Sequence, residues 1–364
     1  MGVVVLPVAE ALARLDGYAQ VIDARSPAEY AADRLPGAVN WPVLDDAERA
    51  LVGTEYAQVS PFEARKRGAA LVARNIAALI ERHLADTPRD WQPLVYCWRG
   101  GQRSGALALV LGQIGFRVAQ LEGGYQAFRR AVVAGIDALA PPLALRVIGG
   151  PTGSGKSRLL QALAAEGAQV LDLEALARHR GSVLGGLPGD AQPTQKAFET
   201  ALWCVLRRLD PARPVWVESE SRRIGALRVP GALIEAMHRA PCLQVEMPRA
   251  ARVALLMADY AHFVQDTAAF CARLDALREL RGHARIDGWQ AAARAGRLAE
   301  VVDELLEVHY DPGYAASSRR HFARLGEAAR VRLDDGSPAR PEAGPGPAGH
   351  PAPPPALSPC AGRR

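Results

Sequence analysis

The chain has 364 residues, a length that favours about two domains. Hydrophobic residues make up 49% of the chain and charged residues 23%, which is typical of a soluble globular protein with a sizeable core. No apolar stretch reaches the roughly 18 residues that a membrane span needs, so we expect no membrane association. The N-terminus lacks the basic region and cleavage site of a secretory peptide, and we expect a short strand there.

The cysteines and the net charge bear on the cellular location of the protein and on its binding partners. The five cysteines are odd in number and widely spaced, which disfavours both a disulfide framework and a Cys-x-x-Cys metal site. We therefore expect a reducing, cytoplasmic location. The formal net charge of +5 is mild but permits a nucleic-acid-binding face.

The first 135 or so residues alternate between predicted strands and helices. The predicted strands are 19–23, 93–96 and 116–121. The predicted helices are 28–32, 64–84, 104–114 and a helix that starts after 123–125 and runs through 133. Ser26 and Pro27 supply a cap and a first helical position for the helix at 28–32. Strands that alternate with helices predict a parallel sheet covered on both faces.

A second α/β domain is predicted after a stiff joint at 138–142, where two prolines stop helix and strand alike. Its predicted strands are 143–149, 168–174, 214–218 and 242–247, and a helical pattern follows from 250 to about 325. Beyond Asp334 the chain is rich in Pro, Ala and Gly, so we predict a disordered tail. The expected domains are therefore 1–137 and 143–330, with the tail at 334–364.

A loop rich in glycine and arginine follows the predicted strand at 93–96 and carries Cys97. Gly100 and Gly101 permit the backbone angles of a tight curl, and Arg99 and Arg103 add positive charge. Cysteine attacks as the thiolate, which such a loop would stabilise. We therefore interpret Cys97, Arg99 and Arg103 as catalytic candidates, able to hold a thiolate, a persulfide or an attached oxyanion.

The second anion site is a complete P-loop pattern between an apolar strand and a helix. Its phosphate-binding residues are Gly150, Thr152, Gly153, Ser154, Gly155, Lys156 and Ser157. Lysine occurs otherwise only at Lys66 and Lys196, while arginine serves everywhere else. Lys156 is a compact charge for phosphate, and Lys196 becomes a second candidate.

A carboxylate partner for the P-loop is expected at the end of a strand. Glu218 and Glu220 occupy such a position, and Asp172 and Glu174 compete from the neighbouring strand. Ser157 and Glu218 are the candidate Mg²⁺ ligands. No aspartate closes an apolar strand in the usual ATPase manner, which leaves room for a diphosphate ligand other than ATP.

Three stretches resemble the signatures of rhodanese sulfurtransferase domains: residues 21–30 (VIDARSPAEY), 35–42 (LPGAVNWP) and 122–129 (EGGYQAFR). Cys97 falls where that family carries its persulfide-forming cysteine. Five residues separate Cys97 from Arg103, one more than in common sulfurtransferase loops, which resembles phosphatases of the same fold. The loop alone leaves sulfur transfer, selenium transfer and phosphatase chemistry open.

The fusion of both domains resembles the tRNA 2-selenouridine synthase family. The matching segments include 59–66 (VSPFEARK), 96–101 (YCWRGG), 149–157, 179–182 (HRGS), 192–199 (QPTQKAFE), 218–222 (ESESR) and 309–314 (HYDPGY). The resemblance implies an N-terminal rhodanese-like parallel sheet with flanking helices, a P-loop NTPase-like α/β domain, and a helical C-terminal part.

The resemblance also implies a reaction. Wobble 2-thiouridine in tRNA would be S-geranylated by geranyl diphosphate and then converted to 2-selenouridine by selenophosphate, supplied by selenophosphate synthetase. We expect the alkyl donor at the P-loop, with Mg²⁺, and the selenium donor at Cys97. Further candidates for substrate or tRNA contacts are Ser182, Gln195, Lys196, Glu218, Arg222 and Arg223.

Two alternatives stay open at this point. One is a rhodanese-type sulfurtransferase or phosphatase coupled to a P-loop nucleotide-binding domain. The other is a non-enzymatic module that binds tRNA under nucleotide control or senses redox state through Cys97.

Overall fold

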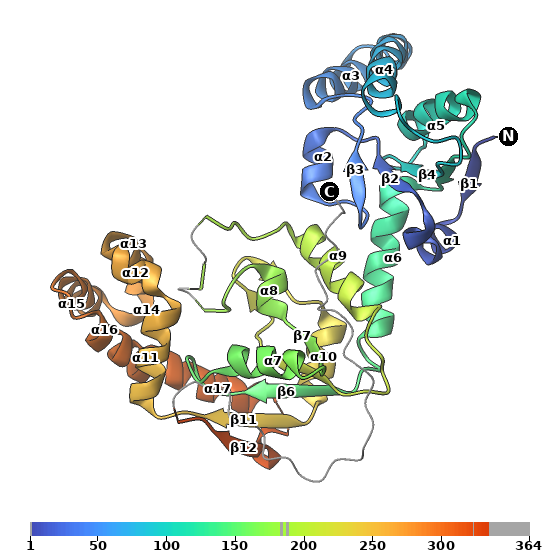
Figure 1. Cartoon of the computed structure of the whole chain (residues 1–364). Coiled ribbons are helices and arrows are strands. Elements are labelled where there is room, and N and C mark those ends of the chain that lie inside the picture. The colour runs from blue at the N-terminus through green and yellow to red at the C-terminus, as the bar shows by residue number, and fades with distance from the viewer. Residues whose placement is uncertain (1, 183–184, 187–188, 323, 335–364) are drawn as a thin grey trace. The chain divides into compact units, whose positions relative to one another are not determined.

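The computed structural model describes residues 2–182, 185–186, 189–322 and 324–334 (Figure 1). Within them the chain forms two compact units. The first unit contains the residues up to Gly135 together with Pro193–Cys204, and the second contains Ile136–Gln192 and the residues from Val205 onward. The tail predicted beyond Asp334 lies outside the described residues.

The first unit is built on a parallel sheet, as the alternation of strands and helices predicted. Within the described residues its strand order is β1-β5-β4-β2-β3, and every pairing is parallel. The strands are β1 (Val4–Leu6), β2 (Gln20–Asp23), β3 (Ala38–Asn40), β4 (Pro93–Tyr96) and β5 (Ala119–Leu121). The helices are α1 (Val8–Ala13), α2 (Pro27–Ala32), α3 (Asp46–Gln58), α4 (Pro61–His83), α5 (Gln102–Ile114), α6 (Gly124–Leu139) and α9 (Gln195–Leu206).

The core of the first unit explains why α4 and α5 lie on this sheet. Ile76 of α4 and Leu107 of α5 pack with Ile22 and Val95 of the strands in one buried cluster. The observed strand β5 is shorter than the strand predicted at 116–121 and begins only at Ala119. Phe116 and Val118 precede β5 and are buried in that cluster, so their apolar character reflects core packing.

The second unit holds a parallel sheet of strand order β12-β11-β6-β8-β7 within the described residues. Its strands are β6 (Leu145–Gly149), β7 (Gln169–Leu171), β8 (Val215–Glu218), β11 (Cys242–Glu246) and β12 (Ala329–Arg332), with an antiparallel pair β9 (Arg223–Ile224) and β10 (Leu227–Arg228). The helices beside the sheet are α7 (Lys156–Ala165), α8 (Leu173–Ala177), α10 (Gly231–Arg239) and α17 (Asp311–His321).

A helical cluster follows β11, as the pattern from 250 to 325 predicted, and Figure 1 shows it in orange and brown. It comprises α11 (Arg249–Asp259), α12 (Ala261–Gln265), α13 (Thr267–Leu274), α14 (Arg278–Arg281), α15 (His283–Arg294), α16 (Leu298–Leu305) and the π-helical turn η3 (Leu306–Tyr310). Its core includes Phe270, Ile286, Trp289 and Leu305, all buried. No helix among the described residues is long and apolar enough to cross a membrane.

One predicted strand in this unit extends too far at its C-terminal end. The predicted strand at 168–174 ends at Leu171, because the Asp172 carboxylate accepts a hydrogen bond from the Ala175 amide at 2.8 Å and caps α8. A capping aspartate of this kind favours helix initiation over strand continuation. Glu174 therefore stands in the first turn of a helix and not in a strand.

Candidate functional site

The phosphate loop occupies residues 150–155 between β6 and α7. Gly150, Gly153 and Gly155 have φ angles of 154°, 76° and 85°, a backbone region that side-chain-bearing residues rarely adopt. A Cβ atom on Gly153 would also lie 2.9 Å from the Leu256 side chain. The loop conformation therefore requires glycine where the sequence pattern supplies it.

The Lys156 ammonium lies against the loop that precedes it. Its Nζ donates to the carbonyls of Gly150 (2.9 Å) and Pro151 (3.3 Å). The free amides at the start of α7 add partial positive charge at the same place, which suits a phosphate group. The strand, the loop and the helix thus bring backbone amides and the Lys156 ammonium together, the arrangement that the sequence pattern predicts for phosphate binding.

Two side chains that the sequence analysis did not assign hold this loop in place by hydrogen bonds. Arg252 is buried, donates from Nε to the Thr152 carbonyl at 2.9 Å, and pairs with the Asp311 carboxylate at 2.6 Å. The Gly150 amide donates to the Tyr314 hydroxyl at 2.5 Å. Asp311 and Tyr314 belong to the segment 309–314, which the sequence analysis identified as a motif. That motif did not indicate what either residue does.

Three carboxylates meet beside the phosphate loop. Oxygens of Glu174, Glu218 and Glu220 all lie within 4.8 Å of one another. Burial and the neighbouring carboxylates raise the pKa of Glu174 to about 9 and that of Glu220 to about 7. Burial also raises the pKa of Glu218, against the opposing effect of Lys156. Without a bound cation, the cluster therefore keeps a proton at neutral pH, on Glu174 in particular.

This cluster fits a divalent cation. Ser157 hydrogen-bonds to the Glu218 carboxylate, while the buried Glu218 Oε1 has no hydrogen-bond partner among the described residues. Oxygen ligands from carboxylates and a hydroxyl are those that Mg²⁺ prefers. The predicted pair of Ser157 and Glu218 is therefore together in space, and Glu174 and Glu220 join it.

A cavity of about 1140 Å³ opens over the phosphate loop and the carboxylates. Four of the predicted contact residues line it, namely Ser182, Glu218, Arg222 and Arg223. Its other side chains include Arg178, Arg180, Arg281, His238, His309 and His321. These arginines and Lys156 place positive charges in the lining beside the carboxylates of Asp172, Glu174, Asp190, Glu218, Glu220 and Asp259, and the positive charges suit the phosphate groups of an anionic ligand.

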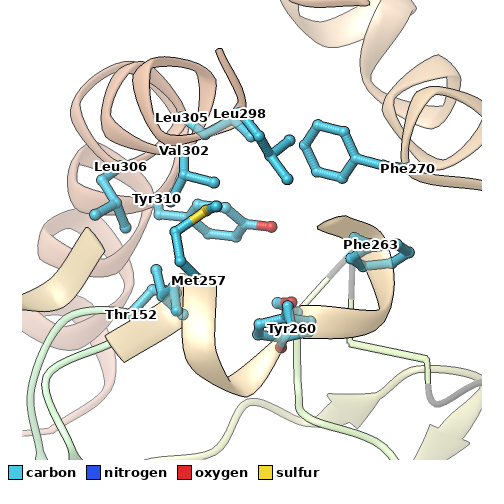
Figure 2. Close-up of a pocket in the computed structure, with 12 residues that line it drawn as sticks. Thr152, Met257, Tyr260, Phe263, Phe270, Leu298, Val302, Leu305, Leu306 and Tyr310 are labelled. Atoms are coloured by element: carbon cyan, nitrogen blue, oxygen red, sulfur yellow. The ribbon is translucent and has the colours of Figure 1, made fainter. Parts of the chain in front are cut away.

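A small apolar pocket of about 50 Å³ adjoins this cavity. Figure 2 shows side chains from α11, α12, α13, α16 and η3 pointing toward one hollow. Its lining residues are Thr152, Ser182, Leu256, Met257, Tyr260, Phe263, Phe270, Leu298, Val302, Leu305, Leu306 and Tyr310. Thr152, Ser182, Leu256, Tyr260 and Tyr310 also line the larger cavity, so phosphate loop and apolar pocket are contiguous.

The Cys97 loop lies in the first unit, between β4 and α5. Cys97 is buried, and its sulfur accepts a hydrogen bond from the Ser104 hydroxyl at 3.3 Å. Gly124 approaches so closely that a Cβ atom there would lie 2.4 Å from the Cys97 carbonyl oxygen. The Tyr125 amide donates to that same oxygen at 2.7 Å, so the start of α6 fixes the loop.

The two arginines of the loop differ in their surroundings. Arg103 donates to the Glu29 carboxylate at 2.7 and 3.3 Å, and Arg99 is exposed. Burial alone would raise the pKa of Glu29, but Arg103 and Arg49 hold it below its usual value. The charge of Arg103 is therefore shared with Glu29 and is not directed at the sulfur alone.

Part of the rhodanese-like signature is structural. Asp23 and Arg25 are fully buried and paired at 2.6 Å, and the Tyr96 hydroxyl donates to Asp23 at 2.7 Å. The Arg25 guanidinium also lies 3.9 Å from the centre of the Tyr125 ring. This network ties the ends of β2 and β4 to the start of α6, next to Cys97.

Gln195 and Lys196 belong to the first unit, whereas the phosphate loop belongs to the second. Both lie on α9, whose first residues belong to the first unit. The Lys196 Nζ lies 5.9 Å from the centre of the Trp98 ring, in the residue after Cys97. Arg129 of α6 donates to the Lys196 carbonyl and pairs with Glu199, which secures α9. Lys196 is thus a cation beside the Cys97 loop.

Comparisons with known proteins find matches to both parts of the chain. Residues 143–285 match the model of the tRNA 2-selenouridine synthase AAA domain, and residues 7–131 match that of the rhodanese-like domain. The tRNA 2-selenouridine synthase of Cupriavidus necator is 36% identical over 340 residues, which cover 84% of this chain and 90% of that protein. The one of Bdellovibrio bacteriovorus is 31% identical over 363 residues, covering 86% and 93%.

Other matches are shorter. The tRNA 2-selenouridine synthase of Nitrosomonas europaea is 38% identical over 244 residues, covering 66% of this chain and 63% of that protein. Among solved structures, the N-terminal domain of a putative ATP/GTP binding protein from Clostridium difficile 630 is 33% identical. It covers 35% of this chain and 98% of that domain, with a TM-score of 0.31.

Proposed function

Because the chain belongs to the tRNA 2-selenouridine synthase family, we propose that it converts wobble 2-thiouridine of tRNA to 2-selenouridine in two steps. The first step is S-geranylation by geranyl diphosphate, and the second is replacement of the S-geranyl group by selenium from selenophosphate. This activity belongs in the cytoplasm, with selenophosphate synthetase as the source of the selenium donor.

In the first step the sulfur of 2-thiouridine attacks C1 of the geranyl group. The C1–O bond breaks, diphosphate leaves with the bonding electrons, and the base loses its N3 proton. The barrier is lowered by groups that stabilise charge developing on the diphosphate. We assign that task to the amides of the phosphate loop and to the Lys156 ammonium, which contacts the loop carbonyls at 2.9 and 3.3 Å.

The observation that carries this proposal is the contiguity of the phosphate loop and the apolar pocket. Thr152 belongs to the loop and also lines the 50 Å³ hollow (Figure 2). A ligand with a phosphate head and a hydrocarbon tail would satisfy both surfaces. Geranyl diphosphate has both parts, which supports the proposal.

Ser157 and the carboxylates of Glu174, Glu218 and Glu220 are the residues that would hold Mg²⁺. Once bound there, the ion would neutralise charge on the diphosphate. The buried Glu218 oxygen without a hydrogen-bond partner among the described residues supports this assignment. Arg222, Arg223 and Ser182 line the same cavity, and we assign them to the diphosphate or to tRNA phosphates.

In the second step selenium of selenophosphate attacks C2 of the base. The C2–S bond breaks, geranylthiolate leaves and takes up a proton, and water then cleaves the Se–P bond to release phosphate. We assign the selenium donor to the Cys97 loop, where Arg99, Arg103 and Lys196 supply positive charge. The 5.9 Å separation of Lys196 from the Trp98 ring supports a role for that ammonium in holding the anion.

Nucleoside mass spectrometry on a reconstituted reaction tests the proposal. The purified chain, Mg²⁺, geranyl diphosphate and tRNA carrying 2-thiouridine should yield S-geranyl-2-thiouridine, and selenophosphate should convert it to 2-selenouridine. Lys156→Ala should abolish geranylation, whereas Cys97→Ala should accumulate the geranylated nucleoside.

Lys66→Ala and Cys242→Ala are matched controls, because Lys66 is exposed and pairs with Glu63 and Cys242 lies on β11. Both should retain the two steps. A wild-type enzyme that forms neither nucleoside would refute the function. Loss of geranylation in Cys97→Ala with an intact fold would refute the division of labour between the loops.

A further inference from the structure

The apolar pocket beside the phosphate loop has a definite end. Figure 2 shows Phe270 of α13 on the side of the hollow opposite Thr152, with Leu298 of α16 beside it. Neither residue lines the larger cavity, in contrast to Tyr260 and Tyr310, which line both. The hollow thus runs from the phosphate loop to a wall made by Phe270 and Leu298.

This wall is rigid. Phe270 and Leu298 are 2% and 7% exposed and belong to the core of the helical cluster. The Phe270 ring lies 5.5 Å from that of Phe263, which packs on Tyr260 in turn at 5.9 Å. Close-packed interiors resist insertion of extra carbon atoms, because side chains must then leave their preferred rotamers.

The volume of the hollow limits what it can hold. It measures about 50 Å³, whereas an engineered apolar cavity that binds benzene measures about 150 Å³. Only the terminal carbons of a hydrocarbon chain fit there, and the carbons nearer the diphosphate must lie in the larger cavity. The distance from the phosphate loop to the wall therefore limits the length of the hydrocarbon chain that can bind.

We infer that Phe270, together with Leu298, forms the end wall that selects the length of the prenyl chain in the alkyl donor. This inference rests on the proposed function and adds the residues that set its specificity. A donor one isoprene unit longer than geranyl, farnesyl diphosphate, would bring five more carbons against this wall. A shorter donor, dimethylallyl diphosphate, would leave the hollow empty.

Competition between geranyl and farnesyl diphosphate tests the inference, with S-alkylated nucleosides quantified by mass spectrometry. Phe270→Leu replaces a large side chain at the wall with a smaller one and so lengthens the hollow. The farnesyl-to-geranyl ratio of kcat/KM should then rise by about tenfold or more, the scale on which hydrophobic pockets discriminate chain length. Thermal unfolding of each variant shows whether the fold is intact.

A pocket-filling variant tests the same idea in the opposite direction. Val302 lies on the same side of the hollow as Leu298 and is partly exposed, so Val302→Phe should narrow the hollow without emptying the core. The ratio of dimethylallyl to geranyl transfer should then rise by about tenfold. This variant keeps the inference falsifiable if Phe270→Leu folds poorly.

Leu274→Ala is the matched control, because Leu274 is buried on α13 like Phe270 but does not line the hollow. It should leave the ratio unchanged. Unchanged ratios in both Phe270→Leu and Val302→Phe would overturn the inference, as would an equal shift in Leu274→Ala. Failure of the wild-type chain to transfer geranyl would refute the proposed function instead, and this is seen before any variant is made.

Discussion

The Tyr314 hydroxyl accepts a hydrogen bond from the Gly150 amide at 2.5 Å, across 164 residues of chain. The same hydroxyl lies 3.4 Å from the Gln244 side-chain oxygen on β11. Helix α17, the phosphate loop and the central sheet of the second unit are thereby joined at one atom. The first residue of the loop is held by a side chain from the C-terminal part of the chain.

Removing that hydroxyl is expected to loosen the loop. Tyr314→Phe leaves the Gly150 amide without its partner, which should cost about 1 kcal/mol of folding free energy. The KM for geranyl diphosphate should rise several-fold while the selenation step is unchanged. Tyr56→Phe, at an exposed position of the first unit, should change neither quantity. An unaltered Tm and KM in Tyr314→Phe would contradict this role.

The pairing of Glu29 with Arg103 predicts a pH-dependent contribution to stability. The pKa of Glu29 is lower in the folded protein than in the unfolded chain, so the stabilisation is fully present above the unfolded value of about 4.3. It is lost as pH falls through the folded pKa. Glu29→Gln should therefore lower the free energy of unfolding by about 2 kcal/mol at pH 7 and by much less near pH 3.

Denaturant unfolding across this pH range measures the effect of Glu29. Glu63→Gln is the comparison, because Glu63 and Lys66 form an exposed pair on one helix, which contributes little. A difference between Glu29→Gln and wild type that does not change between pH 7 and pH 3 would show that the charge of Glu29 is not the cause.

The carboxylate cluster predicts that Mg²⁺ binding stabilises the fold and releases protons. Mg²⁺ at 100 times its Kd should raise the free energy of unfolding by about 2.7 kcal/mol. With a pKa of about 9, Glu174 is protonated at pH 7.5 before the ion binds, so binding must displace its proton. Calorimetry in two buffers of different ionisation enthalpy measures that release. Stabilisation of Glu218→Gln equal to that of wild type would exclude this site.

The position of Lys196 predicts a selective effect on the second step. Lys196→Ala should slow selenation by roughly fivefold, since one exposed charge contact is worth about 1 kcal/mol. Geranylation should be unaffected, because α9 packs on the first unit at this point. Lys196→Arg keeps the charge and should retain most of the rate. Equal slowing of both steps would point to a general role in tRNA binding.

The sequence by itself determined the features that are local. Alternating apolar strands and helices predicted two parallel sheets, because the spacing of apolar residues that distinguishes a strand from a helix is visible within a few residues. Both anion loops could be recognised because their glycines stand in contiguous motifs, and the positive φ angles of Gly153 and Gly155 confirm why those residues are needed. The positions of Cys97 and Lys156 in these loops therefore follow from the sequence alone.

Only the tertiary structure decided what the loops face. Asp172 caps a helix and turns Glu174 toward Glu218, which no strand pattern could foresee. Lys196 follows the phosphate loop in sequence, yet α9 returns it to Trp98 in the first unit. Residues of five helical segments enclose the apolar pocket, and its shape depends on long-range packing. Local propensity sets elements and loops, whereas the contacts between distant segments set the site.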